Sequence, residues 1–249
     1  MAEPERVSEP ANVEIRRATD RAVTTMPWLT SRHSFSFGDY YDPDNTHHGL
    51  LLVNNDDIVS PRTGFRTHPH RDMEIVTWVL QGELTHQDSS GNHGVIYPGL
   101  AQRMSAGSGI LHSERNESPT EQVHFVQMWV APDEAGISPS YQQHELEKDW
   151  ANGSLVTIAS GDRKHNAPLA LHSRNSALHA ARLQPEDAVA LPTAPYLHLF
   201  VTRGRVAVEG MADLEEGDAV RFTDAEARRI TAYEPAEVLV WEMHGKLRG

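Results

Sequence analysis

Two short strings in this sequence carry side chains that could bind a metal ion. One contains His68 and His70, and the other contains His112 and Glu114. Alternate side chains share one face of a β-strand, so the two members of each pair are expected to point the same way. Two such strands facing each other would present three imidazoles and one carboxylate. These donors suit a divalent first-row transition metal with open positions for water or a substrate, and they do not distinguish Fe(II), Ni(II), Cu(II), Mn(II) and Zn(II).

Glu74 competes with Glu114 for the carboxylate position. It has the same parity as the first histidine pair, so spacing alone leaves both carboxylates open. However, Glu74 lies farther from that pair than Glu114 lies from His112, and the twist of a strand would carry it away from a shared centre. We therefore favour Glu114. Gly107 and Gly109 precede His112, and we expect them to allow a tight backbone turn before this histidine.

The remaining histidines are expected to be structural. The sequence has 15 histidines, and imidazole is both a common metal ligand and a near-neutral acid or base, so position must decide the role of each. His198 stands among apolar residues and is expected in the core or at an interface, with its ring nitrogens satisfied. The others that we assign to structure are His33, His47, His48, His86, His93 and His124.

The composition excludes several classes of function. The 249 residues include 22 Lys and Arg against 35 Asp and Glu, a net charge of −13, which disfavours direct binding of nucleic acid. There is no Cys, so thiolate nucleophiles and thiolate metal sites are excluded. No apolar run is long enough for a membrane span, and the acidic N-terminus is unlike an export signal. We expect a cytoplasmic protein without a membrane partner.

Short β-type runs separated by turn residues position these side chains. They fill residues 48–131, as in EIVTWVLQGEL and VHFVQMWV, and they return after residue 166, as in YLHLFVTRGRVAVEG and AEVLVWEMH. Turns at this frequency are typical of a barrel or sandwich. The sequence therefore predicts an all-β chain with two β-barrel halves, 12–132 and 166–249, joined by a crossover over 133–165.

The strings around the predicted ligands resemble those of the pirin family of bicupins. HPHRDMEIVTWVLQGELTHQDSSGN and MSAGSGILHSERN carry the resemblance, together with HSFSFGDYYDP upstream. It covers most of the chain, is strongest over residues 30–132, and extends particularly to the bacterial pirin-like quercetin 2,3-dioxygenases. Gly107 and Ala101 depart from the general cupin pattern, in which proline and glycine often stand at these positions.

The resemblance implies two cupin barrels, of which only the N-terminal one holds a metal, through His68, His70, His112 and Glu114. It implies Fe(II) first, with Ni, Cu, Mn or Zn as alternatives. The activity it implies is the oxidative ring opening of quercetin-like flavonols by O2 with release of CO. Other family members are described as iron-dependent transcriptional co-regulators, which leaves a regulatory protein with a protein partner as the alternative.

Ring opening of this kind would need a base and an apolar wall. Glu114 could serve both as ligand and as acceptor of the proton from a substrate hydroxyl, whose pKa a bound cation lowers. Each candidate for the wall could instead belong to the core. The candidates are Phe35, Phe37, Tyr40, Met73, Met104 and Met128.

Overall fold

The computed structural model describes residues 12–146, 150 and 153–247, and its regular structure is almost entirely β-strand. Two single-turn 3-10 helices interrupt the strands, η1 (Ala18–Asp20) and η2 (Arg163–His165). Among the described residues, no helix has the length and apolar character that crossing a bilayer requires. The N-terminal ten residues, on which the expectation of no export signal rested, lie outside the described part.

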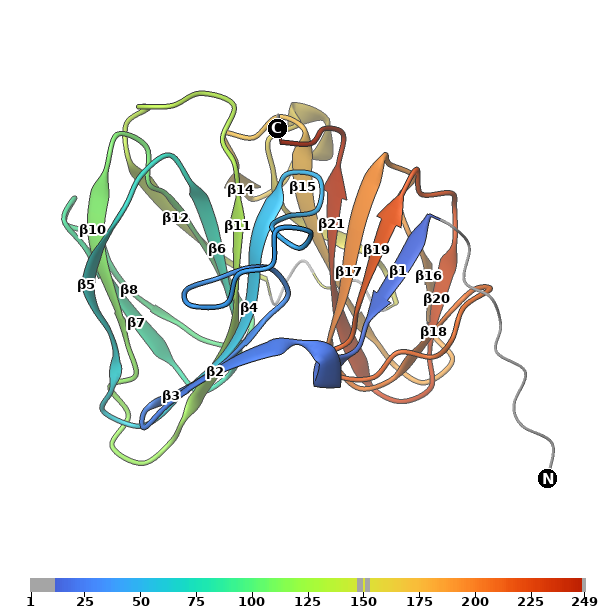
Figure 1. The fold of residues 1–249 in the computed structure, drawn as a ribbon, viewed down its shortest axis with the longest axis horizontal. Helices are drawn as coiled ribbons and strands as arrows, with labels where there is room; N and C mark the ends of the chain where they lie inside the picture. Colours follow the sequence, from blue (N-terminus) through green and yellow to red (C-terminus); the bar gives the residue numbers. More distant parts are fainter. Residues whose placement is uncertain (1–11, 147–149, 151–152, 248–249) are drawn as a thin grey trace.

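The N-terminal barrel consists of a large sheet and a small one, both antiparallel (Figure 1). The order of the large sheet is β12 (Ser140–Glu145), β9 (Leu100–Ser105), β6 (Glu74–Gln81), β11 (Val123–Val130), β4 (Leu51–Val59), β3 (Leu29–His33) and β2 (Ala22–Met26). The order of the small sheet is β5 (Gly64–His70), β10 (Ile110–Arg115), β7 (Leu84–Asp88) and β8 (His93–Ile96).

The C-terminal barrel repeats this arrangement with a smaller second sheet. The order of its large sheet is β1 (Val13–Arg16), β19 (Ala219–Thr223), β17 (Tyr196–Arg203), β21 (Ala236–Met243), β15 (Ser176–Leu183), β13 (Val156–Ser160) and β14 (Leu169–Ala170). The order of its small sheet is β16 (Ala188–Ala190), β20 (Arg229–Ala232) and β18 (Val206–Val208). The prediction of an all-β chain with two barrels is confirmed.

Each of the two large sheets includes an edge strand from outside the half of the chain that was predicted to form it. The first strand, β1, pairs with β19 of the C-terminal barrel, with Val13 opposite Phe222. Strand β12 lies within the predicted crossover but pairs with β9 of the N-terminal barrel, with Ser140 opposite Ser105. Each large sheet therefore ends on a strand supplied from outside the predicted half, which pairs an otherwise open edge.

The two large sheets pack against each other at the centre of the molecule, where β11 and β4 face β15 and β21 in Figure 1. Alternation along β11 explains how one strand serves two environments. Val126 and Met128 point toward the other barrel and belong to the shared core with Leu239 and Trp241. Gln127 and Trp129 point the opposite way, into the N-terminal barrel, where they line a pocket.

The interiors of the two barrels differ in chemistry. Aliphatic side chains such as Leu199, Val220 and Val238 dominate the interior of the C-terminal barrel. The N-terminal barrel has an apolar cluster around Phe125 and Leu84 at one level. Beside this cluster its interior carries buried polar and titratable side chains, so the architecture concentrates the polar chemistry in this barrel.

Candidate metal centre

Strands β5 and β10 bring the two predicted strings together. They pair antiparallel with His112 opposite His68 and Ile110 opposite His70. The ring centroids of His68 and His112 lie 4.5 Å apart, and that of His70 lies 4.8 Å from each of them. One nitrogen from each of the three rings falls within 4.8 Å of the others. The three histidines selected by spacing therefore converge on one point.

Hydrogen bonds on the far side of two rings determine which nitrogen faces that point. His68 Nδ1–H donates to the carbonyl oxygen of Arg66 at 2.7 Å, which leaves Nε2 as a lone pair. His112 Nδ1 lies 3.4 Å from Nδ1 of His86, whose Nε2 lies 3.3 Å from Oδ2 of Asp88. Because the carboxylate can only accept, His86 donates to Asp88 and accepts from His112. His112 Nε2 is therefore also a lone pair.

The third imidazole, that of half-buried His70, has a buried ring nitrogen without a partner in the described part of the chain. Nε2 of His70 has no hydrogen-bond partner among the described groups. Burial, together with the neighbouring histidines, lowers the pKa of His70 to about 4 and that of His112 to about 3. Both rings are thus neutral near pH 7, the protonation state in which imidazole binds a metal.

A shared cation fits these three nitrogens. Nε2 of His68 and Nε2 of His112 face each other at 3.1 Å, although each carries a lone pair. Two nitrogens bound at about 2.1 Å to one ion and at a right angle would lie roughly 3.0 Å apart. The observed spacing, the orphaned His70 nitrogen and the fixed tautomers all suit a divalent ion bound through imidazole.

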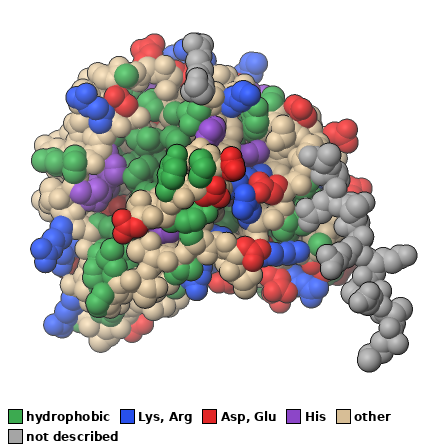
Figure 2. Space-filling model, viewed as in Figure 1, with side chains coloured by type: hydrophobic (Ala, Val, Ile, Leu, Met, Phe, Trp, Pro, Cys, Tyr) green, Lys and Arg blue, Asp and Glu red, His purple; other side chains and the backbone are tan. Residues whose placement is uncertain are grey.

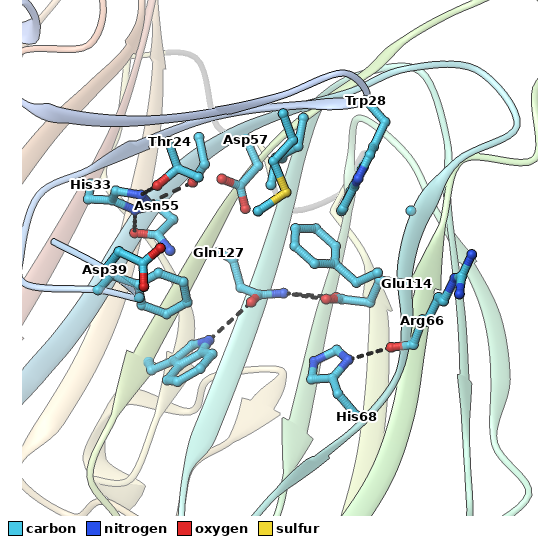
Figure 3. Close-up of a pocket in the computed structure, with 18 of the residues that line it drawn as sticks. Thr24, Trp28, His33, Asp39, Asn55, Asp57, Arg66, His68, Glu114 and Gln127 are labelled. Atoms are coloured by element: carbon cyan, nitrogen blue, oxygen red, sulfur yellow. Dashed lines mark hydrogen bonds between the residues drawn. The ribbon is translucent and has the colours of Figure 1, made fainter.

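Glu114 lies beside the histidine cluster and is held from β11. One of its oxygens lies within 4.8 Å of a ring nitrogen of His112 and of His86. Gln127 Nε2 donates to both carboxylate oxygens, at 2.9 and 2.7 Å, and Trp129 Nε1 donates to Gln127 Oε1 at 3.2 Å. The carboxylate and His68 line the same pocket in Figure 3. Sequence reasoning missed Gln127 and Trp129 because neither belongs to a local motif.

Glu74, the rival carboxylate, lies on the face of β6 that is turned toward the second half of the chain, away from the histidine cluster. Its Oε2 accepts from the Ser105 hydroxyl at 2.9 Å and from the backbone N–H of His172 at 3.1 Å, in the contact with the second half of the chain. Strand parity does not carry across from His70 because β5 ends there and the backbone turns through Asp72, with φ of 49°. The preference for Glu114 over Glu74 agrees with this geometry.

The glycines before His112 meet a backbone requirement. Gly107 has φ of +48°, and a Cβ at this position would lie 2.1 Å from the carbonyl oxygen of Ile137. Gly109 has φ of +133°, a conformation that side chains disfavour. The turn between β9 and β10 is therefore built for glycine, as the sequence predicted.

His68, His70 and Glu114 line a pocket of about 610 Å³, and His112 is buried behind them. Aromatic and apolar side chains make up much of the remaining wall, and they include Trp28, Phe65, Trp129, Phe37, Met26 and Leu29. Figure 2 shows histidine side chains reaching the surface among hydrophobic ones on the N-terminal barrel. Of the six wall candidates from sequence, only Phe37 lines this pocket. Phe35, Met104 and Met128 are buried in the cores, and Tyr40 and Met73 do not line the pocket.

The other histidines have varied surroundings, and two assignments change. His86 lies behind His112 and accepts the hydrogen bond that orients its ring, so His86 supports the metal centre and is not only structural. His198 is buried against Phe35 at the contact between the barrels, but neither ring nitrogen has a hydrogen-bond partner, contrary to the expectation of a satisfied residue. His33 lines the pocket, and His124 bonds to Asp56 on the other face of β4.

Two family models match most of this chain. The model described as Pirin covers residues 16–130, and the model described as the quercetinase C-terminal cupin domain covers residues 157–243. The chain belongs to the pirin family. The resemblance found in the sequence is thereby confirmed, and the two barrels are the N-terminal and C-terminal cupin domains of a pirin.

Pirins of known sequence or structure align with almost the whole chain. A Mycobacterium bovis protein, provisionally named a quercetin 2,3-dioxygenase, is 68% identical over 95% of this chain and 97% of its own length. The Escherichia coli protein named quercetin 2,3-dioxygenase is 37% identical over 93% of this chain and 98% of its own. The crystal structure of the bacterial pirin YhhW from Escherichia coli in complex with nickel(II) matches with a TM-score of 0.86 and 35% identity, covering 94% of this chain and 100% of that one.

Proposed function

We propose that this pirin is a metal-dependent dioxygenase that opens the heterocycle of quercetin-like flavonols, consuming O2 and releasing CO. The observation that carries the proposal is the convergence of three imidazole nitrogens, two of them with lone pairs fixed by hydrogen bonds, beside Glu114 and a pocket rich in aromatic side chains. The names of the relatives support the substrate class.

His68, His70, His112 and Glu114 would hold one divalent ion. We propose Fe(II) first, with Ni, Cu, Mn or Zn as alternatives, since three nitrogens and one oxygen accommodate each of them. When bound, such an ion lowers the pKa of a coordinated hydroxyl and provides a site for activating the substrate toward O2.

Glu114 would take the proton from the substrate hydroxyl. Gln127 donates to both of its oxygens, so the carboxylate is oriented while lone pairs remain for the ion or the substrate. A general base must lie within hydrogen-bond reach of the proton it takes, and Glu114 shares the pocket with His68 and His70. Trp129 fixes the amide of Gln127 and packs edge-on against His70 at 4.9 Å, so one side chain braces both parts of the centre.

The walls of the pocket suit a flat aromatic ligand. Trp28 and Phe65 form an edge-to-face pair with centroids 5.2 Å apart, and Phe37 and Trp129 form another at 5.5 Å. All four line the pocket. Burial between such rings favours an aromatic substrate and excludes water from the reacting atoms.

The decisive experiment reconstitutes the protein separately with Fe(II), Ni(II), Cu(II), Mn(II) and Zn(II) and follows quercetin absorbance and CO release after O2 is admitted. Metal-dependent turnover should vanish in His112→Ala and fall sharply in Glu114→Gln. His93→Ala is the matched control because His93 is exposed on β8 and does not line the pocket.

Absence of turnover with every bound metal would reject the dioxygenase. The same centre would then fit the alternative of an iron-dependent regulatory protein, whose surface a protein partner reads. Turnover that persists in metal-loaded Glu114→Gln would reject the role of Glu114 as the proton acceptor while leaving the activity in place.

A further inference from the structure

A second group of polar side chains lies in the same pocket, away from the histidine cluster. Strands β2, β3 and β4 supply it, and Figure 3 shows Thr24, His33, Asn55 and Asp57 together on the side of the pocket opposite His68. None of these residues belongs to the metal centre. Their presence in a largely apolar pocket calls for a function, because buried polar groups cost stability unless they are paired.

Asp57 has an incompletely paired carboxyl group. The residue is 3% exposed, yet it lines the pocket, and its Oδ1 has no hydrogen-bond partner among the described groups. Burial raises the pKa of Asp57 to about 7, partly offset by the Ser31 hydroxyl, while the charges of Asp56 and Glu114 raise it further. A buried carboxyl oxygen facing a pocket without a partner marks a place where a ligand can supply one.

Asn55 is fixed in a donating orientation beside it. His33 Nδ1 lies 2.9 Å from Asn55 Oδ1, and His33 Nε2 lies 2.8 Å from the Thr24 hydroxyl. The amide oxygen accepts from the ring, so the hydroxyl of Thr24 donates to the other ring nitrogen. With its oxygen engaged in this way, Asn55 turns its NH2 group to the opposite side of the amide. The pair therefore offers a donor from Asn55 and a carboxyl group from Asp57.

The register of β4 against β11 places Asn55 and Asp57 relative to Gln127, which holds Glu114 at the metal end of the pocket. Asn55 is directly opposite Gln127, the residue that holds Glu114. Asp57 is the next residue of β4 on the same face and lies opposite Phe125. Residues two apart on a strand are about 7 Å apart, so Asp57 is displaced by roughly that length along the pocket. A ligand in contact with both Glu114 and Asp57 must span at least this length, which a fused aromatic ring system does.

We propose that Asp57 and Asn55 form a subsite for a hydroxyl group at the end of the substrate remote from the metal. The subsite makes the pocket selective for aromatic compounds with hydroxyl groups at both ends over those with a hydroxyl only at the metal. The substrate class rests on the proposed function, whereas the subsite itself rests on the geometry of β3, β4 and β11.

The test measures anaerobic binding to the metal-loaded protein, which does not depend on turnover. The probes are quercetin, which has hydroxyls on its outer rings, and 3-hydroxyflavone, which keeps only the hydroxyl expected at the metal. The quantity of interest is the ratio of the dissociation constant of 3-hydroxyflavone to that of quercetin. We expect Asp57→Leu to lower this ratio about tenfold, the effect of losing one net hydrogen bond.

Two further variants separate recognition from folding. Asp57→Asn keeps the shape and a hydrogen-bonding group, and its ratio should stay within about threefold of the wild-type value. Asn55→Ala removes the neighbouring donor and should also lower the ratio. Asp57→Leu also removes the hydrogen bond from the Ser31 hydroxyl, so retained affinity for 3-hydroxyflavone is the check that the pocket of this variant is folded.

An unchanged ratio in Asp57→Leu, or equal weakening of both probes, would overturn the subsite. A ratio that falls as far in Asp57→Asn as in Asp57→Leu would overturn its hydrogen-bonding role. Loss of discrimination in a protein that binds quercetin without oxidising it would support the subsite and reject the proposed function. If the protein oxidises quercetin but Asp57→Leu leaves the ratio unchanged, the proposed function is supported and the subsite is rejected.

Discussion

Nε2 of His68 and Nε2 of His112 face each other at 3.1 Å across paired strands, and each carries its proton on the other nitrogen. The backbone carbonyl of Arg66 fixes one ring, and His86 fixes the other. Two lone pairs at this distance repel unless a cation lies near both. The protein therefore holds its imidazoles in a geometry that a bound ion stabilises.

Metal binding is consequently expected to stabilise the fold. At a free metal concentration 100 times the dissociation constant, a ligand that binds only the native state adds about 2.7 kcal/mol to the free energy of unfolding. Thermal unfolding of the metal-loaded protein with and without a strong chelator measures this gain. The melting temperature should fall on chelation and recover when metal is restored.

His70→Ala provides the comparison for this prediction. It removes a ring nitrogen that has no other partner, so added metal should raise the melting temperature of this variant much less than that of the wild type. His93→Ala, on the exposed strand β8, should respond as the wild type does. Equal stabilisation of all three proteins would place the metal elsewhere.

His86 should control metal affinity without contacting substrate. It accepts from His112 and donates to Asp88, and such outer partners typically contribute 10- to 100-fold to affinity. His86→Leu should weaken metal binding by about this factor, measured by competition with a chromophoric chelator. His86→Gln retains an acceptor and should restore part of the affinity, whereas equal losses in both variants would mean that only packing changed.

The part of the centre that follows from local spacing could be predicted from the sequence. His68 and His70 alternate along β5, His112 and Glu114 alternate along β10, and the two strands pair as neighbours. The alternation rule does not extend from His70 to Glu74, because the backbone turns at Asp72 between strands β5 and β6. A residue with positive φ other than glycine is not evident from sequence.

The residues that hold and extend the centre depend on pairings distant in sequence. Gln127 reaches Glu114 only because β11 crosses the same barrel, and Asp57 shares their pocket because β4 pairs with β11. Strand β1 likewise joins a sheet more than 200 residues away along the chain, where Val13 is opposite Phe222. No local pattern specifies these partners, so alternation could predict the strands but not their neighbours.

Met128 should stabilise the packing between the two barrels. It is fully buried in the shared core, and Trp241 Nε1 lies 3.2 Å from its sulfur. Met128→Ala leaves a cavity between the sheets and should lower the free energy of unfolding by about 2–5 kcal/mol. Denaturant titration measures this loss, with Met26→Ala as the control because Met26 is 47% exposed. A loss below about 0.5 kcal/mol would show that the interface repacks.

Glu242 should make stability depend on pH in the acid range. Burial alone would raise the pKa of this carboxyl, but hydrogen bonds from His179 and His244, at 2.9 and 2.6 Å, lower it to about 2. The ordinary value for glutamate is 4.5. Since the native pKa lies below the unfolded one, the contribution is fully present above pH 4.5 and is lost as pH falls toward 2.

Glu242→Gln therefore isolates this contribution. The difference in unfolding free energy between wild type and variant should be constant above about pH 5 and should shrink between pH 4.5 and 2. Glu216→Gln, at an exposed position, should leave the pH profile of the wild type unchanged. A wild-type and Glu242→Gln difference that stays constant down to pH 2 would mean that the carboxyl titrates alike in both states, and that the two histidines do not stabilise its charge.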